Sequence, residues 1–231
     1  MTTAKSVVII TGASRGLGAA LAAHFLQDKN WEVVGVSRHL PEPSDAQHDS
    51  ERKHFVVLGD VSDPETAVRA FDQAELLGTP KLLINSAGAA TFGSAGSYTK
   101  SDVEVNFAAG LVGTILVTEE ALRRYRSSGI TVVNVMSTAA HVGRANEAVY
   151  CASKWGARGY TESLRIELKG TPNRVIGVYP GGMRTKFWNA KGAENVDPIK
   201  FMNPEEVASA IYSAIQSKPN FYISDIILNR G

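Results

Sequence analysis

The sequence predicts an α/β fold in which a doubly wound parallel sheet of about seven strands carries helices on both faces. Two observations predict this fold. Short, continuous runs rich in Val and Ile alternate with segments of helical spacing. A glycine-rich turn follows the first of these runs. Buried parallel strands have such unbroken apolar runs because helices cover both faces of their sheet.

The alternation gives the order of the elements. Pro64 and Pro204 fit the first turn of a helix, and Asp63 and Asn203 precede them as N-caps. The expected strands are residues 7–10, 33–36, 55–58, 82–84, 131–135, 175–179 and 221–228, and the expected helices are residues 16–29, 64–77, 99–126, 147–169 and 204–217. Two segments lack a period and are expected to be irregular, residues 39–54 as a surface loop and residues 186–203 after a second glycine turn.

Composition limits the class of protein. A chain of 231 residues suffices for one large core but not for a second substrate domain, so we expect one domain over residues 1–231. Lys and Arg total 24 and Asp and Glu total 23, which gives no electrostatic case for nucleic acid or an anionic membrane. The single cysteine, Cys151, excludes an internal disulfide and is interpreted as a small helix residue. No signal peptide, membrane-spanning run or metal site is predicted, and we expect a cytoplasmic protein.

Tyr150 and Lys154 carry the strongest chemical signal. Residues four apart share one face of a helix, and Ser137 ends an apolar run upstream. A nearby cation favours a phenolate and lowers the phenol pKa from its usual value near 10. The pair would then exchange a proton near neutral pH, with Ser137 bonded to the reacting oxygen. Taken alone, the pair also fits a helix face with a tyrosine and a solvated lysine.

The segment TGASRGLG, residues 11–18, connects the first strand to the first helix. Glycine permits a sharp turn and a close approach to a pyrophosphate, and the free N–H groups of the following helix attract that anion. A tight turn without a ligand is the alternative. The position between a strand and a helix favours nucleotide binding.

The end of the second strand favours NADP over NAD. An NAD site usually has an acidic residue there, to bind the ribose 2′-hydroxyl. Here the strand ends in Ser37 and Arg38. Arg38 and Arg15 would hold a 2′-phosphate, and Ser37 would donate a hydrogen bond. Alternatively, Arg38 starts a polar loop, and Arg15 stacks on adenine or faces water.

Together these motifs resemble the short-chain dehydrogenase/reductase family, of the NADP-dependent carbonyl reductase type, over roughly residues 6–228. They are TGASRGLG, the segment Asn85-Ser86-Ala87-Gly88, Ser137 with the Tyr150 and Lys154 pair, and Pro180-Gly181-Gly182. The resemblance implies a single Rossmann-type domain. The chain departs from the family in having Asn85-Ser86 for the usual Asn-Asn pair, and in weak support for a helix between the second and third strands.

The resemblance also implies roles for residues. Tyr150 would be the general acid in reduction and the base in the reverse direction, and Lys154 would lower its pKa and bind the nicotinamide ribose. Ser137 would orient the substrate carbonyl. Asn106 would support a water relay to Lys154, although a satisfied internal amide fits this residue equally well.

For the cofactor, the resemblance implies contacts along the ends of the strands. Asp60 and Val61 would contact adenine, and Asn85 would brace the central strands. An ordinary loop acid is the alternative for Asp60, and an exposed turn hydroxyl is the alternative for Thr185. The implied cofactor-binding residues are Gly12, Ser14, Arg15, Gly16, Leu17, Gly18, Ser37, Arg38, Asp60, Val61, Asn85, Ala87, Gly88, Tyr150, Lys154, Pro180, Gly181, Met183 and Thr185.

The expected function is reduction of a ketone or aldehyde by NADPH. Residues 138–147 would line one wall of the substrate pocket, where His141 fits packing better than catalysis. Residues 186–203 would form a short lid, whose apolar side chains fit either the substrate or the core. A nucleotide-sensing protein without turnover, and an isomerase or dehydratase, are the alternatives. Through the helices at residues 99–126 and 147–169, the resemblance implies a homodimer or homotetramer. The lid side chains are Phe187, Trp188, Ile199, Phe201 and Met202.

Overall fold

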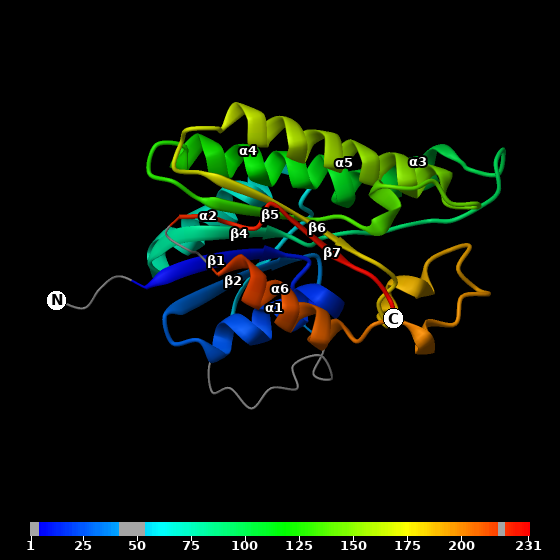
Figure 1. The fold of residues 1–231 in the computed structure, drawn as a ribbon, viewed down its shortest axis with the longest axis horizontal. Helices are drawn as coiled ribbons and strands as arrows, with labels where there is room; N and C mark the ends of the chain where they lie inside the picture. The colour runs from blue at the N-terminus through cyan, green and yellow to red at the C-terminus, as the bar shows by residue number, and fades with distance from the viewer. Residues whose placement is uncertain (1–4, 42–53, 217–219) are drawn as a thin grey trace.

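Seven parallel strands form one sheet in the order β3-β2-β1-β4-β5-β6-β7. Figure 1 shows this sheet in a computed structural model, which describes residues 5–41, 54–216 and 220–231. The strand order reverses between β1 and β4, and such a switch point creates a crevice at the carboxyl ends of the strands. The strands are β1 (Ser6–Thr11), β2 (Trp31–Ser37), β3 (Phe55–Leu58), β4 (Thr79–Asn85), β5 (Thr131–Val135), β6 (Arg174–Pro180) and β7 (Asp225–Leu228).

Helices cover both faces of the sheet (Figure 1). Side chains alternate along β1, so Val8 and Ile10 pack against α1 and α6 on one face. Val7 and Ile9 pack on the other face against α2, α4 and α5. The predicted doubly wound sheet is therefore confirmed. The helices are α1 (Gly16–Gln27), α2 (Pro64–Leu77), α3 (Lys100–Phe107), α4 (Thr114–Tyr125), α5 (Ala148–Glu167) and α6 (Pro204–Ile215).

Both predicted N-caps are confirmed. The Asp63 side chain accepts a hydrogen bond from the Glu65 amide at the start of α2. The Asn203 side chain accepts one from the Glu205 amide at the start of α6. These caps satisfy amides that have no partner within the helix, so they fix where each helix begins.

The long helix predicted at residues 99–126 contains a π-helical segment. This segment, η1 (Ala108–Gly113), joins α3 to α4. A Cβ on Gly113 would lie 2.4 Å from Cγ2 of Val61, so the segment packs tightly against the loop after β3. Single π turns within helices are frequent at functional sites.

The last strand is shorter than predicted, and the prediction of a strand from residue 221 is wrong. β7 pairs with β6 only from Gly177 opposite Asp225 to Pro180 opposite Leu228. Phe221 and Tyr222 precede it as exposed, unpaired residues. The start of β7 is therefore set by where hydrogen bonding to β6 begins, and not by where the apolar residues begin. Most of the predicted loop at residues 39–54 lies outside the described residues.

One helical run passes a simple test for a membrane span. Lys100–Tyr125 has a mean hydropathy of 1.3 in its most apolar window, and half of that window is buried inside the protein. This test does not overturn the prediction that the chain has no membrane-spanning run, because the helical run includes charged residues such as Asp102 and Glu104. Buried core helices pass the same test, so the run is weak support for a membrane.

Candidate active site

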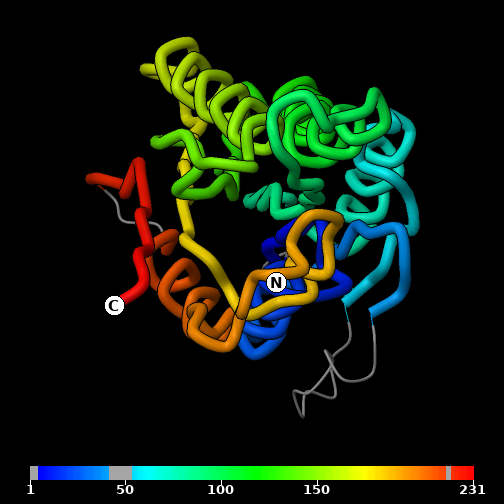
Figure 2. Tube along the Cα trace, turned by 90° about the vertical axis from the view of Figure 1, so that its right-hand side faces the viewer, coloured from blue at the N-terminus to red at the C-terminus, as the bar shows by residue number. Residues whose placement is uncertain are grey.

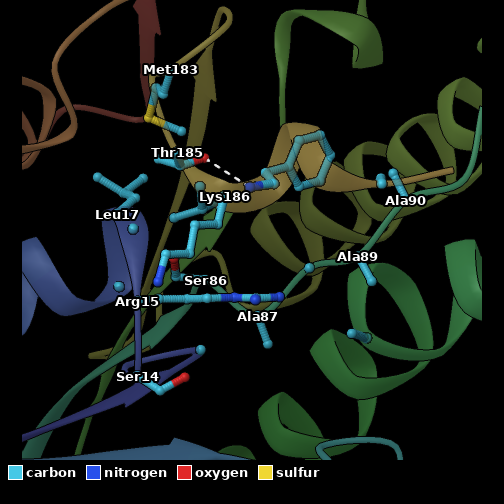
Figure 3. A pocket seen from close by; sticks show the side chains of 18 of the residues that line it. Ser14, Arg15, Leu17, Ser86, Ala87, Ala89, Ala90, Met183, Thr185 and Lys186 are labelled. Carbon is cyan, nitrogen blue, oxygen red and sulfur yellow. Dashed lines mark hydrogen bonds between the residues drawn. The ribbon is translucent and has the colours of Figure 1, made fainter. Parts of the chain in front are cut away.

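A cleft of about 500 Å³ opens at the carboxyl ends of the strands. Figure 2 views this end of the molecule, with residues 186–203 lying across it in orange. Figure 3 shows Arg15, Ser86, Ala87 and Lys186 around the cleft. Every residue predicted for the site lines this cleft except Asn85 and Asn106.

The glycine turn forms one end of the cleft through backbone packing. Gly12 and Gly16 have φ angles of +71° and +56°, which favour glycine. A Cβ on Gly18 would lie 2.2 Å from the Gly12 carbonyl oxygen. A Cβ on Gly12 would lie 2.8 Å from Cα of Ala87. The turn, the start of α1 and the end of β4 are therefore close enough to exclude side chains.

Arg15, Arg38, Ser37 and Asp60 line the same end of the cleft. The Ser37 hydroxyl donates to the His39 carbonyl at 2.6 Å, so its proton is already committed. The hydroxyl would have to turn from this carbonyl to donate to a 2′-phosphate, so that role of Ser37 stays a prediction. Backbone and side-chain hydrogen bonds from Ser62, the first being the larger cause, lower the pKa of the Asp60 carboxyl.

Ser137, Tyr150 and Lys154 meet at the other end of the cleft. Tyr150 and Lys154 lie one turn apart on α5, and all three side chains are buried. The Lys154 Nζ lies 5.8 Å from the centroid of the Tyr150 ring. Ser137 caps the short helix η2 (Thr138–Ala140), where its Oγ accepts from the Ala139 amide at 3.1 Å.

Burial shifts the pKa values of both Tyr150 and Lys154. It raises the pKa of the Tyr150 phenol to about 12, although a hydrogen bond with Ser137 lowers it. It lowers the pKa of the Lys154 amine to about 8. The expectation that Lys154 brings the Tyr150 pKa below its usual value is therefore wrong for the protein alone. Desolvation disfavours the charged form of both groups, and it is the largest cause of each shift.

Asn106 is a satisfied internal amide, one of the two alternatives that the sequence left open. Its Nδ2 donates to Oγ1 and the carbonyl of Thr91 and to the carbonyl of Asp102. Its Oδ1 accepts from the Thr91 amide at 3.4 Å. The residue is buried and fixes the segment before η1 rather than facing the cleft.

Asn85 lies behind the cleft at the end of β4. Its Nδ2 donates to Oγ1 of Thr118 and to Oδ1 of Asn134, each at 2.9 Å. This is the strand-bracing role that the resemblance implied. The residue does not line the cleft, so its geometry favours the bracing role, and a direct cofactor contact stays a prediction.

Aromatic side chains surround Tyr150 on the substrate side. The Phe92 ring meets Tyr150 edge-on at 5.6 Å and stacks on Trp188 at 5.7 Å. Phe187 contacts both Phe92 and Tyr150. Of the predicted lid side chains, Phe187 and Trp188 line the cleft, whereas Ile199 is 68% exposed.

The remaining lid side chains pack elsewhere. Phe201 packs on Trp188 with ring centroids 5.0 Å apart. Met202 packs against the core beside α1 and α6. The lid segment therefore serves both expected roles. Phe187 and Trp188 line the cleft, where a substrate would bind, whereas Met202 packs in the core.

One ion pair connects the lid segment to α3. The Lys191 Nζ lies 2.9 and 2.8 Å from the two carboxylate oxygens of Asp102. This contact and the Thr99 cap lower the pKa of Asp102 to about 2. The Lys191 carbonyl also accepts from the Phe92 amide at 2.8 Å, so the lid segment lies against the aromatic wall.

Sequence reasoning did not single out Arg144, Lys186 or Phe92. Arg144 and Lys186 line the cleft, although each comes from a range predicted to form a wall or lid. The signal that could have identified them was a positive charge within a range expected to line the substrate pocket. For Phe92 no local signal existed. His141 packs on Tyr179 with ring centroids 4.3 Å apart, which confirms the packing interpretation.

The residues of the cleft fit a dinucleotide. A Cβ on Gly88 would meet only the Lys154 Nζ, at 3.9 Å, so a side chain there would project into open space beside the amine. Two guanidinium groups, Arg15 and Arg38, face the glycine-turn end. Cations at one end and a buried proton-transfer pair at the other suit a long ligand that has phosphates at one end and a reactive ring at the other.

Comparisons with known proteins agree with this geometry. Residues 6–196 match the family model for short chain dehydrogenases. Carbonyl reductase family member 4 of Danio rerio is 31% identical, over 96% of this chain and 94% of the relative. Sepiapterin reductase of Chlorobaculum tepidum is 28% identical, over 97% and 96%. A solved short-chain dehydrogenase/reductase from Vibrio parahaemolyticus is 33% identical over 97% and 96% of the two chains, with a TM-score of 0.83. This chain therefore belongs to the short-chain dehydrogenase/reductase family of oxidoreductases, which bind nicotinamide cofactors.

Proposed function

We propose that this protein is an NADPH-dependent reductase of ketones or aldehydes. The observation that carries the proposal is the burial of Tyr150 and Lys154 together, beside Ser137, at the end of a cleft that holds two arginines at its other end. A carbonyl reductase and a sepiapterin reductase among the relatives support a reductase.

Tyr150 supplies the proton in this proposal. Because burial raises its pKa to about 12, the phenol is neutral at pH 7 and has a proton to give. Ser137 accepts from the Ala139 amide, which leaves its hydroxyl proton to be donated within the cleft, to the Tyr150 oxygen in the protein alone and to the substrate carbonyl in this proposal. As the carbonyl oxygen gains charge, both hydroxyls stabilise it at hydrogen-bond distance.

Lys154 stabilises the phenolate that remains after proton transfer. Its amine has a pKa of about 8 and is mostly charged at pH 7. A Cβ on Gly110 would lie 3.6 Å from the Lys154 Nζ, so small residues leave room for the amine. The reduced nicotinamide ring, when bound, supplies the hydride.

The preference for NADP rests on Arg38 and Arg15. Both line the cleft, and Arg38 is close enough to Asp60 to lower the pKa of that carboxyl. An arginine binds a phosphate with two parallel hydrogen bonds, which a ribose hydroxyl does not offer. The Ser37 hydroxyl joins this contact only if it turns away from the His39 carbonyl, to which it donates in the protein alone.

A nucleotide sensor without turnover is less well supported. A protein that only senses nucleotide has no need for a buried tyrosine beside a buried lysine, since burying both costs stability. The full set of Ser137, Tyr150 and Lys154 therefore favours an enzyme.

We also propose a cytoplasmic homodimer or homotetramer. Val103, Val105, Val112 and Trp155 are exposed on the α3–α5 side of the molecule. Exposed apolar groups of this kind are typical of protein interfaces. Light scattering of the purified protein tests the assembly, and a monomer at micromolar concentration would contradict it.

A panel of carbonyl compounds tests the function. NADPH oxidation is followed by absorbance, with NADH as the control cofactor. Tyr150→Phe removes only the hydroxyl, so kcat should fall by about 10²- to 10⁴-fold while the Kd for NADPH stays unchanged. Tyr222→Phe, at an exposed tyrosine, is the matched control and should keep full activity. Retained activity in Tyr150→Phe would rule out the assigned acid, and no oxidation with any compound would favour the sensor.

A further inference from the structure

Arg144 is a charged residue in the cleft to which the proposed reaction gives no role. It lies in the turn between η2 and α5, and it lines the cleft together with Ser137, Tyr150 and Trp188. Its guanidinium therefore belongs to the substrate side. Its side chain is 34% exposed and pairs only loosely with Glu147, so the guanidinium can still take an anionic partner, which a site for neutral ketones alone would not need.

The turn that carries Arg144 has a fixed backbone. Asn146 has a φ of +62°, a left-handed conformation that is uncommon for residues other than glycine. Its carbonyl accepts two hydrogen bonds, from the Gly93 amide and from the Tyr98 hydroxyl, each at 2.9 Å. A residue stays in such a conformation only where surrounding contacts hold it there, and conformations of this kind are frequent at functional sites.

The Arg144 side chain is held on one side only. Its Nη2 donates to Oγ1 of Thr138 at 2.5 Å. Its Nη1 lies 3.7 Å from Oε2 of Glu147, which is an ion pair but too long for a hydrogen bond. A guanidinium has five N–H donors, so within the described part of the chain most of its donors remain uncommitted.

Glu147 does not satisfy the guanidinium. Its Oε2 is buried and has no hydrogen-bond partner among the described residues. Burial raises the pKa of the Glu147 carboxyl, and Arg144 lowers it. This nearby carboxylate would repel a dianion more than a monoanion. The site therefore suits a planar carboxylate better than a phosphate.

We propose that Arg144 binds a carboxylate on the substrate, so that the enzyme prefers oxo acids to neutral carbonyl compounds of the same shape. The inference rests on the proposed function. The carboxylate contacts the guanidinium, the carbonyl faces Ser137 and Tyr150, and an aryl or alkyl group packs against Phe187 and Trp188, which line the cleft. A planar carboxylate matches the guanidinium through two parallel hydrogen bonds.

Benzoylformate and its methyl ester test this inference, because they differ mainly in charge. Wild-type protein should give a higher kcat/KM for the acid. Arg144→Gln should lower kcat/KM for the acid by about 10- to 100-fold, the size of a lost hydrogen bond to a charged group. The ester should change by less than about three-fold, and Arg144→Lys should recover part of the loss. Arg126→Gln, at an arginine that pairs with Glu167 and does not line the cleft, is the matched control.

Two outcomes overturn the inference. Equal losses for acid and ester would mean that Arg144 acts only through Tyr150, and a wild-type preference for the ester would contradict a carboxylate site. Calorimetric titration with benzoylformate needs no turnover. Equal affinity of wild type and Arg144→Gln, or no binding, overturns the inference even if no compound is reduced. Turnover of neutral ketones without this discrimination would overturn the inference and leave the proposed function intact.

Discussion

The two ends of the cleft are built differently. At the glycine-turn end, backbone packs on backbone, since a Cβ on Gly18 or Gly12 would overlap neighbouring main-chain atoms. At the substrate end, the side chains of Arg144, Phe187 and Trp188 line the cleft, and the Asp102–Lys191 ion pair joins the lid segment to α3. A backbone contact tolerates no substitution, whereas a wall of side chains can change one residue at a time. We therefore expect substitutions at the glycine-turn end to cost more stability than substitutions at the substrate end.

The same substitution at each end tests this comparison most strongly. In Gly18→Ala the new Cβ would meet a carbonyl oxygen at 2.2 Å, so the turn must move. We expect a loss of roughly 3 kcal/mol of unfolding free energy, the upper end for overpacking, and weaker cofactor binding. Gly143→Ala, beside Arg144, meets no atom within 4 Å and should change stability by less than about 0.5 kcal/mol. Chemical unfolding measures the stability of both variants. Similar stabilities for the two variants would contradict the proposed difference between the two ends of the cleft.

Lys154 lies at the end of the cleft opposite the glycine turn, and its burial predicts a pH dependence of stability. Its pKa is about 8 in the folded protein, against 10.5 for a lysine side chain in water. Between these values the unfolded chain binds more protons, so this residue makes stability rise with pH. Below pH 8 the buried charge costs the folded state up to about 3 kcal/mol.

Lys154→Met should therefore be more stable than wild type at pH 7, and the gap should close between pH 8 and 10.5. Thermal unfolding across this range measures it. Tyr150, whose pKa is raised, lowers stability only above pH 10. Lys81→Met, at an exposed lysine, should show no such pH-dependent gap. If the stability difference between Lys154→Met and wild type did not vary with pH, side-chain packing rather than the buried charge would be its cause.

Arg38→Asp tests the cofactor end without disturbing the backbone. The new carboxylate would repel a 2′-phosphate and accept from a 2′-hydroxyl. We expect the Kd for NADPH to rise by about 10- to 100-fold and the Kd for NADH to change little. Fluorescence titration with each cofactor measures the ratio, and equal losses would count against the preference for NADP.

Asp102→Asn is expected to have the smallest effect, confined to the substrate end. Asparagine keeps an acceptor for the Thr99 cap but loses the charge that pairs with Lys191. The KM for the carbonyl substrate should rise by about two- to five-fold, the scale of one surface ion pair, and cofactor affinity should not change. The control is Glu104→Gln, which removes the exposed pair with Lys100 on the same helix. An equal change in cofactor affinity would show that the two ends are coupled.

The sequence by itself determined the features that depend on near neighbours in the chain. Apolar periodicity gave the strands and helices, and the Asp63 and Asn203 caps gave two helix starts. The glycine turn and the one-turn spacing of Tyr150 and Lys154 located both ends of the cleft. Such sequence patterns are reliable because the direction of side chains and the backbone hydrogen bonds within one helix or strand depend only on residues a few positions apart.

Only the tertiary structure decided what depends on burial and on contacts between distant segments. The Asp102–Lys191 pair joins residues 89 positions apart, and Asn106 is fully bonded because Thr91 folds against it. Desolvation raised the pKa of Tyr150, although the neighbouring lysine predicted the opposite. No local pattern encodes how far water is excluded from a side chain, because the whole fold sets that quantity.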